Sequence, residues 1–213
     1  MSKKTVVSLV CGAVFGLAAS VAGAADITVT TTVRVTSGTF DGHNNRYIAK
    51  GLGDGGQGEN QKPVFRVENG ATLRNVRVGA PGADGIHTYN GANLANIVWE
   101  DVGEDAMTVK SSGNVTLNGG SASKATDKVL QVNAATTFTI SNFTATTFGT
   151  FLRQNGGTGF TITVRATNVT LNSGSNGFRT DSSSSQFYHR NVRFNSVTTP
   201  WRVPNQSAQV HAF

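Results

Sequence analysis

Apolar and polar residues alternate over short runs from about residue 25 onward, as they do in β-strands with one buried face. Thr, Asn, Ser, Gly and Val dominate there, and no amphipathic stretch of normal helical length interrupts the pattern. The pattern predicts one all-β domain over residues 25–213, without a linker or a second domain.

Short strands that begin with Asn recur at nearly equal intervals. The interval from Asn75 to Asn96 is 21 residues, that from Asn168 to Asn191 is 23, and the 46 residues from Asn96 to Asn142 make two such steps. A repeat of this length matches one coil of a β-solenoid, whose stacked coils bury a continuous apolar column. We therefore predict a right-handed parallel β-helix, with Asn at a sharp turn and hydrogen-bonded to its counterpart in the next coil.

A β-sandwich is the competing interpretation, and it would place hairpin turns between the alternating segments. Two turn-forming pairs do occur, Asn69-Gly70 and Asn90-Gly91, but they lie 21 residues apart, in step with the coils. This spacing favours the solenoid. The open ends of a solenoid need covering, so we expect residues 26–40 and 198–213 to form caps.

The start of the chain has a different pattern. Lys3 and Lys4 precede an apolar run from Val6 to Val21, and Ala22-Gly23-Ala24 supplies the small residues of a cleavage site. These features predict a secretory signal peptide over residues 1–24. We expect a secreted, extracellular protein that has no membrane anchor after cleavage.

Charge and cysteine content change once this peptide is removed. The formal net charge falls from +6 to +4 because two lysines leave, and the single cysteine, Cys11, leaves with them, so the mature chain could form no disulfide. A basic balance suggests a polyanionic partner. The chain has no basic arm and no aromatic-interleaved basic motif, so nucleic acid is not the expected partner. We expect a monomer.

Acidic residues are concentrated in one place. Four of the 12 fall within Glu100–Asp105, and Asp84 lies 21 residues before Asp105, one coil away. Stacking would bring Asp84 beside this run, where several carboxylates suit a hard cation such as Ca²⁺. Neither Cys nor paired His accompanies the run, which disfavours zinc. A solvated turn is the alternative interpretation.

Basic residues follow about one coil further on. Lys110, Lys124, Lys128 and Arg153 stand on weakly charged coils, and the 25 residues from Lys128 to Arg153 are close to one coil. Any one lysine alone would be read as a solvated surface residue. Together, a Ca²⁺ site and a Lys/Arg row indicate a groove for an anionic polymer such as a uronate polysaccharide.

Uronate chemistry fits these residue types. The hydrogen on C5 of a uronate can be abstracted only if the developing negative charge is neutralised, which Ca²⁺ and an Arg on the adjacent carboxylate can do. The base would be a Lys or Arg whose pKa is lowered by a nearby cation and by burial. A hydrolase would need two carboxylates flanking the bond, and the run at residues 100–105 leaves that alternative open.

Two strings, GAPGADGIH at 79–87 and WEDVGEDA at 99–106, closely resemble the secreted class III pectate lyases, polysaccharide lyase family 3. Shorter matching stretches extend the resemblance from about residue 33 to 195. It implies a right-handed parallel β-helix that cleaves pectate, which is de-esterified polygalacturonate, by Ca²⁺-dependent β-elimination. Pectin catabolism and degradation of the plant cell wall would be its use. A non-catalytic uronate-binding β-helix and a galacturonan hydrolase are the alternatives.

The resemblance also implies roles for individual residues. The proposed base falls on Lys128, and the arginine that binds the substrate carboxylate falls on Arg153. His87 lies in the motif, where a structural role is expected. The implied calcium ligands are Asp84, Asp101, Glu104 and Asp105, with the carbonyl of Val102 as an addition. The substrate-binding positions are Lys110 and Glu59, to which the lysine row adds Lys124.

The chain departs from the family pattern in two ways. Thr88 and Ala92 stand where family members commonly carry cysteines, so a disulfide is absent. Thr150 replaces a groove lysine three residues before Arg153. Losing one cation should weaken substrate binding more than it abolishes elimination.

Overall fold

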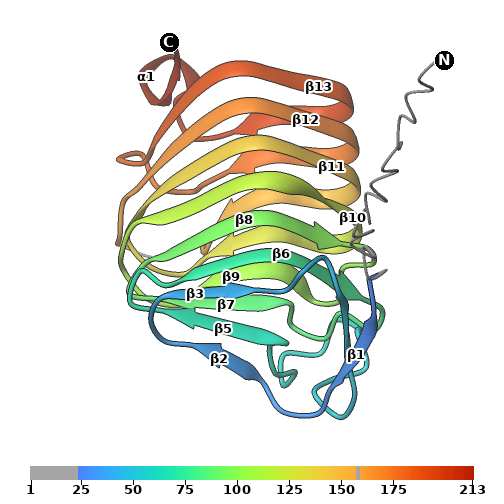
Figure 1. The fold of residues 1–213 in the computed structure, drawn as a ribbon. Helices are drawn as coiled ribbons and strands as arrows, with labels where there is room; N and C mark the ends of the chain where they lie inside the picture. Colours follow the sequence, from blue (N-terminus) through green and yellow to red (C-terminus); the bar gives the residue numbers. More distant parts are fainter. Residues whose placement is uncertain (1–23, 157–158) are drawn as a thin grey trace, which may run out of the picture.

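The structure is a computed structural model that describes residues 24–156 and 159–213. The predicted signal peptide lies outside the described residues except for Ala24. The described chain forms a stack of coils that rises from β1 to β14, and no helix in it is long and apolar enough to cross a membrane (Figure 1). The elements are β1 (Asp26–Val29), β2 (Val33–Val35), β3 (Thr39–Asp41), β4 (Arg46–Ala49), β5 (Phe65–Glu68), β6 (Thr72–Gly79), β7 (Ile86–Tyr89), β8 (Ala92–Trp99), β9 (Asp105–Val109), β10 (Val115–Val132), β11 (Thr136–Gln154), β12 (Ile162–Arg179), β13 (Gln186–Arg202), α1 (Gln206–Gln209) and β14 (Val210–Ala212).

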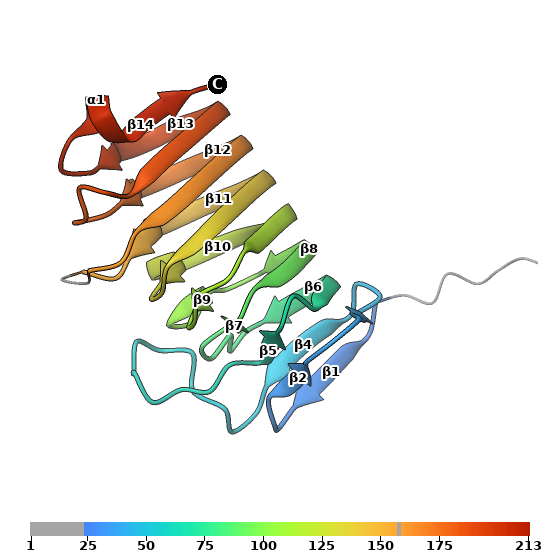
Figure 2. The ribbon, with the colours of Figure 1, turned by 90° about the vertical axis from the view of Figure 1, so that its left-hand side faces the viewer.

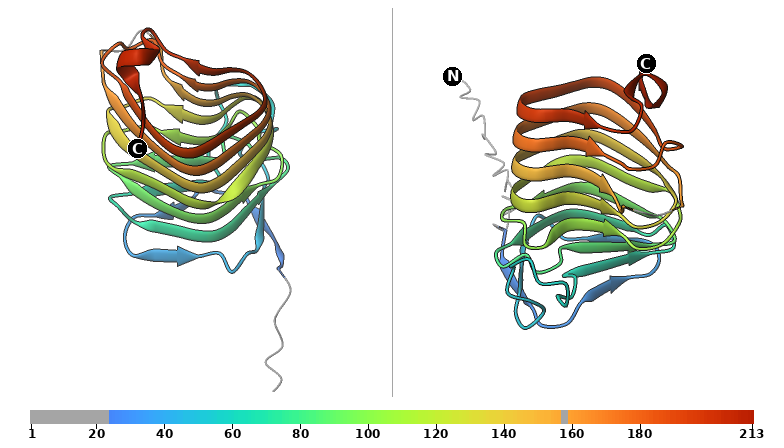
Figure 3. Two further views of the ribbon diagram at one scale, coloured as in Figure 1. Left: turned by 90° about the horizontal axis from the view of Figure 1, so that it is seen from above. Right: turned by 180° about the vertical axis from the view of Figure 1, so that it is seen from behind.

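The coils are joined by parallel pairing throughout. One path of hydrogen-bonded strands runs β1-β4-β6-β8-β10-β11-β12-β13-β14, and a second runs β2-β5-β7-β9 and joins β10. In the later coils one long strand continues around a corner where the earlier coils have two short ones (Figure 2). The front and back views show a right-handed winding (Figures 1 and 3). The predicted parallel β-helix is confirmed, and the β-sandwich is excluded because the pairs are not antiparallel hairpins.

The Asn residues of the repeat form a ladder at one corner of the coils. Their φ angles lie between 51° and 54°, in the left-handed region that Asn tolerates better than most residues. Neighbouring amides are hydrogen-bonded: Asn96 Nδ2 donates to Asn75 Oδ1 at 3.0 Å, and Asn191 Nδ2 donates to Asn168 Oδ1 at 2.8 Å. The ladder consists of Asn75, Asn96, Asn142, Asn168 and Asn191.

Aromatic side chains fill the axis of the later coils. Phe143 contacts Phe151 at a centroid distance of 6.1 Å, and Phe151 meets Phe178 edge to face at 5.3 Å. Trp201 stacks on Phe178 at 4.6 Å and closes the column. Each such pair contributes about 0.5–1.5 kcal/mol beyond its area burial, so the column stabilises neighbouring coils against sliding.

The two ends differ from the expected caps. Residues 26–40 form the first coil rather than a separate cap, because β1, β2 and β3 pair in register with β4, β5 and β6. At the other end β13 continues to Arg202 as part of the last full coil, so only α1 and β14 cover it. Gln209 in α1 is buried and donates to the carbonyls of Ser182 and Ser185 at 2.8 and 2.9 Å.

Candidate active site

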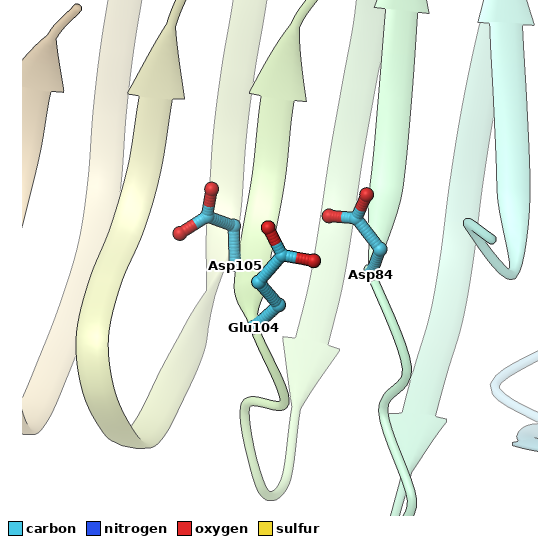
Figure 4. A group of neighbouring side chains, drawn as sticks. All are labelled: Asp84, Glu104 and Asp105. Atoms are coloured by element: carbon cyan, nitrogen blue, oxygen red, sulfur yellow. The ribbon is translucent and has the colours of Figure 1, made fainter. Parts of the chain in front are cut away.

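Three carboxylates from neighbouring coils converge on one face of the solenoid (Figure 4). Asp84 stands in the turn before β7, while Glu104 and Asp105 stand at the start of β9, and one oxygen of each lies within 4.8 Å of the others. The β7–β9 register pairs Ile86 with Met107, which keeps the 21-residue offset between Asp84 and Asp105. The juxtaposition predicted from that spacing is therefore observed.

Glycine allows the two turns to approach each other. Gly85 has φ +47°, and a Cβ there would lie 2.1 Å from the carbonyl oxygen of Ala106. A Cβ at Gly103 would lie 2.2 Å from the carbonyl oxygen of Ala83. Since a side chain at either position would push the turns apart, these glycines set the separation of the carboxylates.

Burial and mutual repulsion disfavour charge on this cluster. Burial first, and then the carboxylates of Asp84, Asp105 and Glu59, raise the pKa of Glu104 to about 7. Burial also raises the pKa of Asp105 to about 7; Lys128 opposes this rise and Asp84 adds to it. A cation among these groups would reverse both effects.

The cluster also offers free ligand atoms. Asp84 Oδ1 and Glu104 Oε2 are buried and have no hydrogen-bond partner among the described residues. His87 is buried and its Nε2 lies 2.6 Å from Asp84 Oδ2, which fixes that carboxylate. Burial lowers the pKa of His87, with Asp84 acting against it. An all-oxygen set with unpartnered atoms fits a hard cation such as Ca²⁺.

The structure does not bring every expected ligand into the cluster. Asp101 lies outside the group and is half exposed, with its Oδ2 3.6 Å from Lys124 Nζ. The side chain of Val102 is buried and its amide donates to the carbonyl of Ser123 at 3.1 Å. Glu59, expected to bind substrate, instead approaches Glu104 closely enough to affect its titration. We infer that Glu59 belongs with the carboxylates rather than with the groove.

Two of the expected lysines border the cluster. Lys128 is the register partner of Asp105, and its Nζ lies 3.4 Å from Asp105 Oδ1 and also pairs with Asp127. Lys110 Nζ lies 4.0 Å from Asp84 Oδ2. Burial opposes the charge on Lys128, but Asp127 and Asp105 outweigh it, so the pKa of Lys128 is raised. The sequence led us to expect a lowered pKa because the contribution of Asp127 was not considered.

Arg153 lies one coil beyond Lys128 in a pocket of about 230 Å³. Its Nη2 is 2.6 Å from Asp181 Oδ2. Thr150, the register partner of Lys128, is buried in the same pocket. Arg179 also lines it, a residue to which we assigned no role from the sequence. Its 26-residue offset from Arg153 could have revealed it, since the offset is one lengthened coil.

Lys124 does not share this pocket. It lines a different hollow of about 490 Å³, together with Thr126, Phe148 and residues of the next two coils. Of the basic residues expected to act together, Lys110, Lys128 and Arg153 therefore stand close to the carboxylates or in the adjoining pocket, while Lys124 accompanies Asp101.

Comparison with known proteins identifies this arrangement. The family model described as "Pectate lyase" matches residues 18–200 of the chain. The chain belongs to the pectate lyase family. The matched region includes the carboxylate cluster, Lys128 and Arg153.

Curated relatives within the family are fungal. Probable pectate lyase E of Neosartorya fischeri is 40% identical over 144 residues, which are 65% of this chain and 56% of the relative. Pectate lyase E of Emericella nidulans is 37% identical over 147 residues, 66% of this chain and 58% of the relative. The chain thus spans a little more than half the length of these relatives.

Solved pectate lyases share the fold. PelI from Erwinia chrysanthemi in complex with tetragalacturonic acid superposes with a TM-score of 0.62 at 21% identity, covering 87% of this chain and 70% of that one. Pel3 from Pectobacterium carotovorum superposes with a TM-score of 0.63 at 22% identity, covering 85% and 67%. These two likenesses support the parallel β-helix independently of the strand pairing.

Proposed function

We propose that this chain is a secreted pectate lyase that cleaves polygalacturonate by Ca²⁺-dependent β-elimination. The observation that carries the proposal is the convergence of Asp84, Glu104 and Asp105 beside Lys128, with Arg153 one coil away on the same face. Family membership supports the reaction type. The apolar pattern of residues 1–24 supports secretion.

In this proposal Asp84, Glu104 and Asp105 hold the Ca²⁺, with Glu59 nearby. The bound ion neutralises negative charge on the substrate carboxylate, which acidifies the hydrogen on C5. Arg153 binds the same carboxylate, and Asp181 fixes the orientation of its guanidinium at 2.6 Å.

Lys128 Nζ then accepts the proton from C5. The C4–O bond breaks, a C4=C5 double bond forms, and the leaving glycosidic oxygen is protonated. Lys128 must be neutral to act, and its pairing with Asp127 and Asp105 holds it protonated. Alkaline conditions, and any loss of negative charge at Asp105, therefore favour the reaction.

Formation of unsaturated uronides from polygalacturonate, followed by ultraviolet absorbance at alkaline pH, tests the proposal. We expect product with Ca²⁺, none with chelator, and a loss of roughly 10²- to 10⁴-fold in Lys128→Ala. Lys50→Ala, at an exposed position after β4, is the matched control and should retain activity. Persistent product in Lys128→Ala would contradict the role of Lys128.

A non-catalytic uronate-binding β-helix is the second candidate, favoured by the raised pKa of Lys128 and by Thr150 at the groove position. Retardation of the wild-type chain in a polygalacturonate gel, without product absorbance, would identify it. New reducing ends without absorbance would instead indicate a hydrolase.

A further inference from the structure

Arginine side chains continue from Arg153 across the last two coils. The β11–β12 register places Arg153 opposite Arg179, and the β12–β13 register places Arg179 opposite Arg202. Neighbouring strands lie about 4.8 Å apart, so these residues follow one line along the solenoid axis. We call Arg153, Arg179 and Arg202 the arginine row.

The arginine row carries more positive charge than its neighbours compensate. Asp181 pairs with Arg153, and its side chain is 54% exposed. Burial, and then repulsion from Arg153 and Arg202, lower the pKa of Arg179, while Asp181 and Asp127 act in the other direction. Arg179 Nε and Arg153 Nη1 are buried without a hydrogen-bond partner among the described residues. An anionic ligand would relieve the repulsion and supply these partners.

A neutral polar row runs beside the arginine row. The same registers align Thr150, Asn176 and Thr199 on β11, β12 and β13. Asn176 Nδ2 lies 3.4 Å from Thr150 Oγ1, and Thr150 lines one pocket with Arg153 and Arg179. Hydroxyl and amide groups can both donate and accept hydrogen bonds, as sugar hydroxyls require. A cationic row beside such a neutral row matches a polymer that carries one carboxylate and several hydroxyls per unit.

The opposite direction along the groove differs in charge. Arg34 and Arg66 are register partners on β2 and β5, on the other side of the carboxylate cluster. Glu68 pairs with both, at 2.7 Å from Arg34 Nη2 and 3.0 Å from Arg66 Nε. The excess positive charge therefore lies on the C-terminal side of Lys128.

We propose that the arginine row binds successive carboxylates of one extended polyuronate chain, so that Arg179 and Arg202 form two further sugar-binding subsites on the C-terminal side of Lys128. This inference rests on the proposed function for the identity of the polymer. It adds a preferred direction and a minimum length for the bound chain.

Calorimetric titration with oligogalacturonates from dimer to hexamer, in Ca²⁺, tests the subsites without requiring turnover. Wild-type affinity should rise with length as the oligomer reaches Arg179 and Arg202. Arg179→Gln should weaken hexamer binding roughly tenfold, and the more exposed Arg202→Gln roughly threefold, while both variants bind the dimer as the wild type does. Arg179→Lys should retain part of the length dependence, which separates loss of charge from loss of fold.

Matched controls lie on the same strands. Arg165→Gln is near the other end of β12, and Arg193→Gln is an exposed position of β13. Both should bind every oligomer as the wild type does. Equal weakening at all lengths, or no weakening in Arg179→Gln, overturns the proposed subsites. Length-dependent binding without unsaturated product would overturn the lyase alone, and product without length dependence would overturn the arginine row alone.

Discussion

Replacing Asp105 by Asn should make the Ca²⁺-free protein more stable at pH 8, although it removes a charged side chain that pairs with Lys128. Asp105 is 4% exposed, and its pKa is raised from 3.8 to about 7. The unfolded chain loses the proton near the ordinary value, whereas the folded chain keeps it until about 7. The folded state is therefore progressively disfavoured between these pH values, and the full penalty is present above pH 7.

The size of the effect follows from the same values. A pKa change from 3.8 to about 7, at about 1.4 kcal/mol for each tenfold change in proton affinity, gives at most ~4 kcal/mol. Burying the Asn amide also costs free energy. We therefore expect Asp105→Asn to raise the free energy of unfolding by about 2 kcal/mol in chelator at pH 8. That corresponds to a rise in Tm of about 4–8 °C for a chain of this length.

Urea denaturation of wild type and Asp105→Asn, at pH 5 and pH 8, with chelator and with excess Ca²⁺, measures this. The gain should shrink toward pH 5, and Ca²⁺ should stabilise the wild type far more than the variant. Asp26→Asn is the control, because the Asp26 side chain is 65% exposed and only 3.5 Å from its partner Arg46. A variant less stable than wild type in chelator at pH 8, or equal stabilisation of both by Ca²⁺, would refute the reasoning.

Three further predictions concern the cluster, the groove and the corner ladder. Affinity for Ca²⁺ should fall roughly tenfold or more from pH 8 to pH 6, because Glu104 and Asp105 take up protons near pH 7; calorimetry at both values checks this, and equal affinities would contradict it. Thr150→Lys should change the KM for polygalacturonate by less than about threefold, since the arginine row already supplies cations, and a larger fall in KM would show that the row contributes little. Asn168→Ala should lower the free energy of unfolding by about 1–2 kcal/mol, because Ala at φ +54° is strained and loses the amide contact with Asn142 at 3.1 Å. Urea denaturation, with Asn168→Gly as the less affected comparison, measures that loss, and unchanged stability would argue against the ladder.

The fold could be predicted because one local requirement recurs in every coil. A residue that tolerates positive φ must stand at the corner, and Asn at 75, 96, 142, 168 and 191 records the period directly. The same period located Asp84 beside Asp105, since coils of equal length keep equal offsets in register. The first coil was mistaken for a cap because its strands are short and carry no Asn ladder signal that differs from a loop.

The rest of the site escaped prediction where coil length changes. Lys128 to Thr150 is an offset of 22, whereas Arg153 to Arg179 is 26, so a fixed period misaligns the later coils. Arg179 was missed for this reason. Asp127 was missed because its effect on Lys128 depends on side-chain direction, which the spacing does not determine.

The position of charge along the axis gives Thr150 a different meaning from the one expected. A lysine there would stand in register between Lys128 and Asn176, and in one pocket with Arg153 and Arg179, where it would add to the repulsion among cations. With arginine on the two following coils, positive charge is already available to the polymer at the next positions along the groove. Thr150 instead extends the neutral row that can meet sugar hydroxyls. The replacement therefore moves the polymer-binding charge toward the C-terminal coils rather than removing it, which is why the length dependence of binding is the decisive measurement.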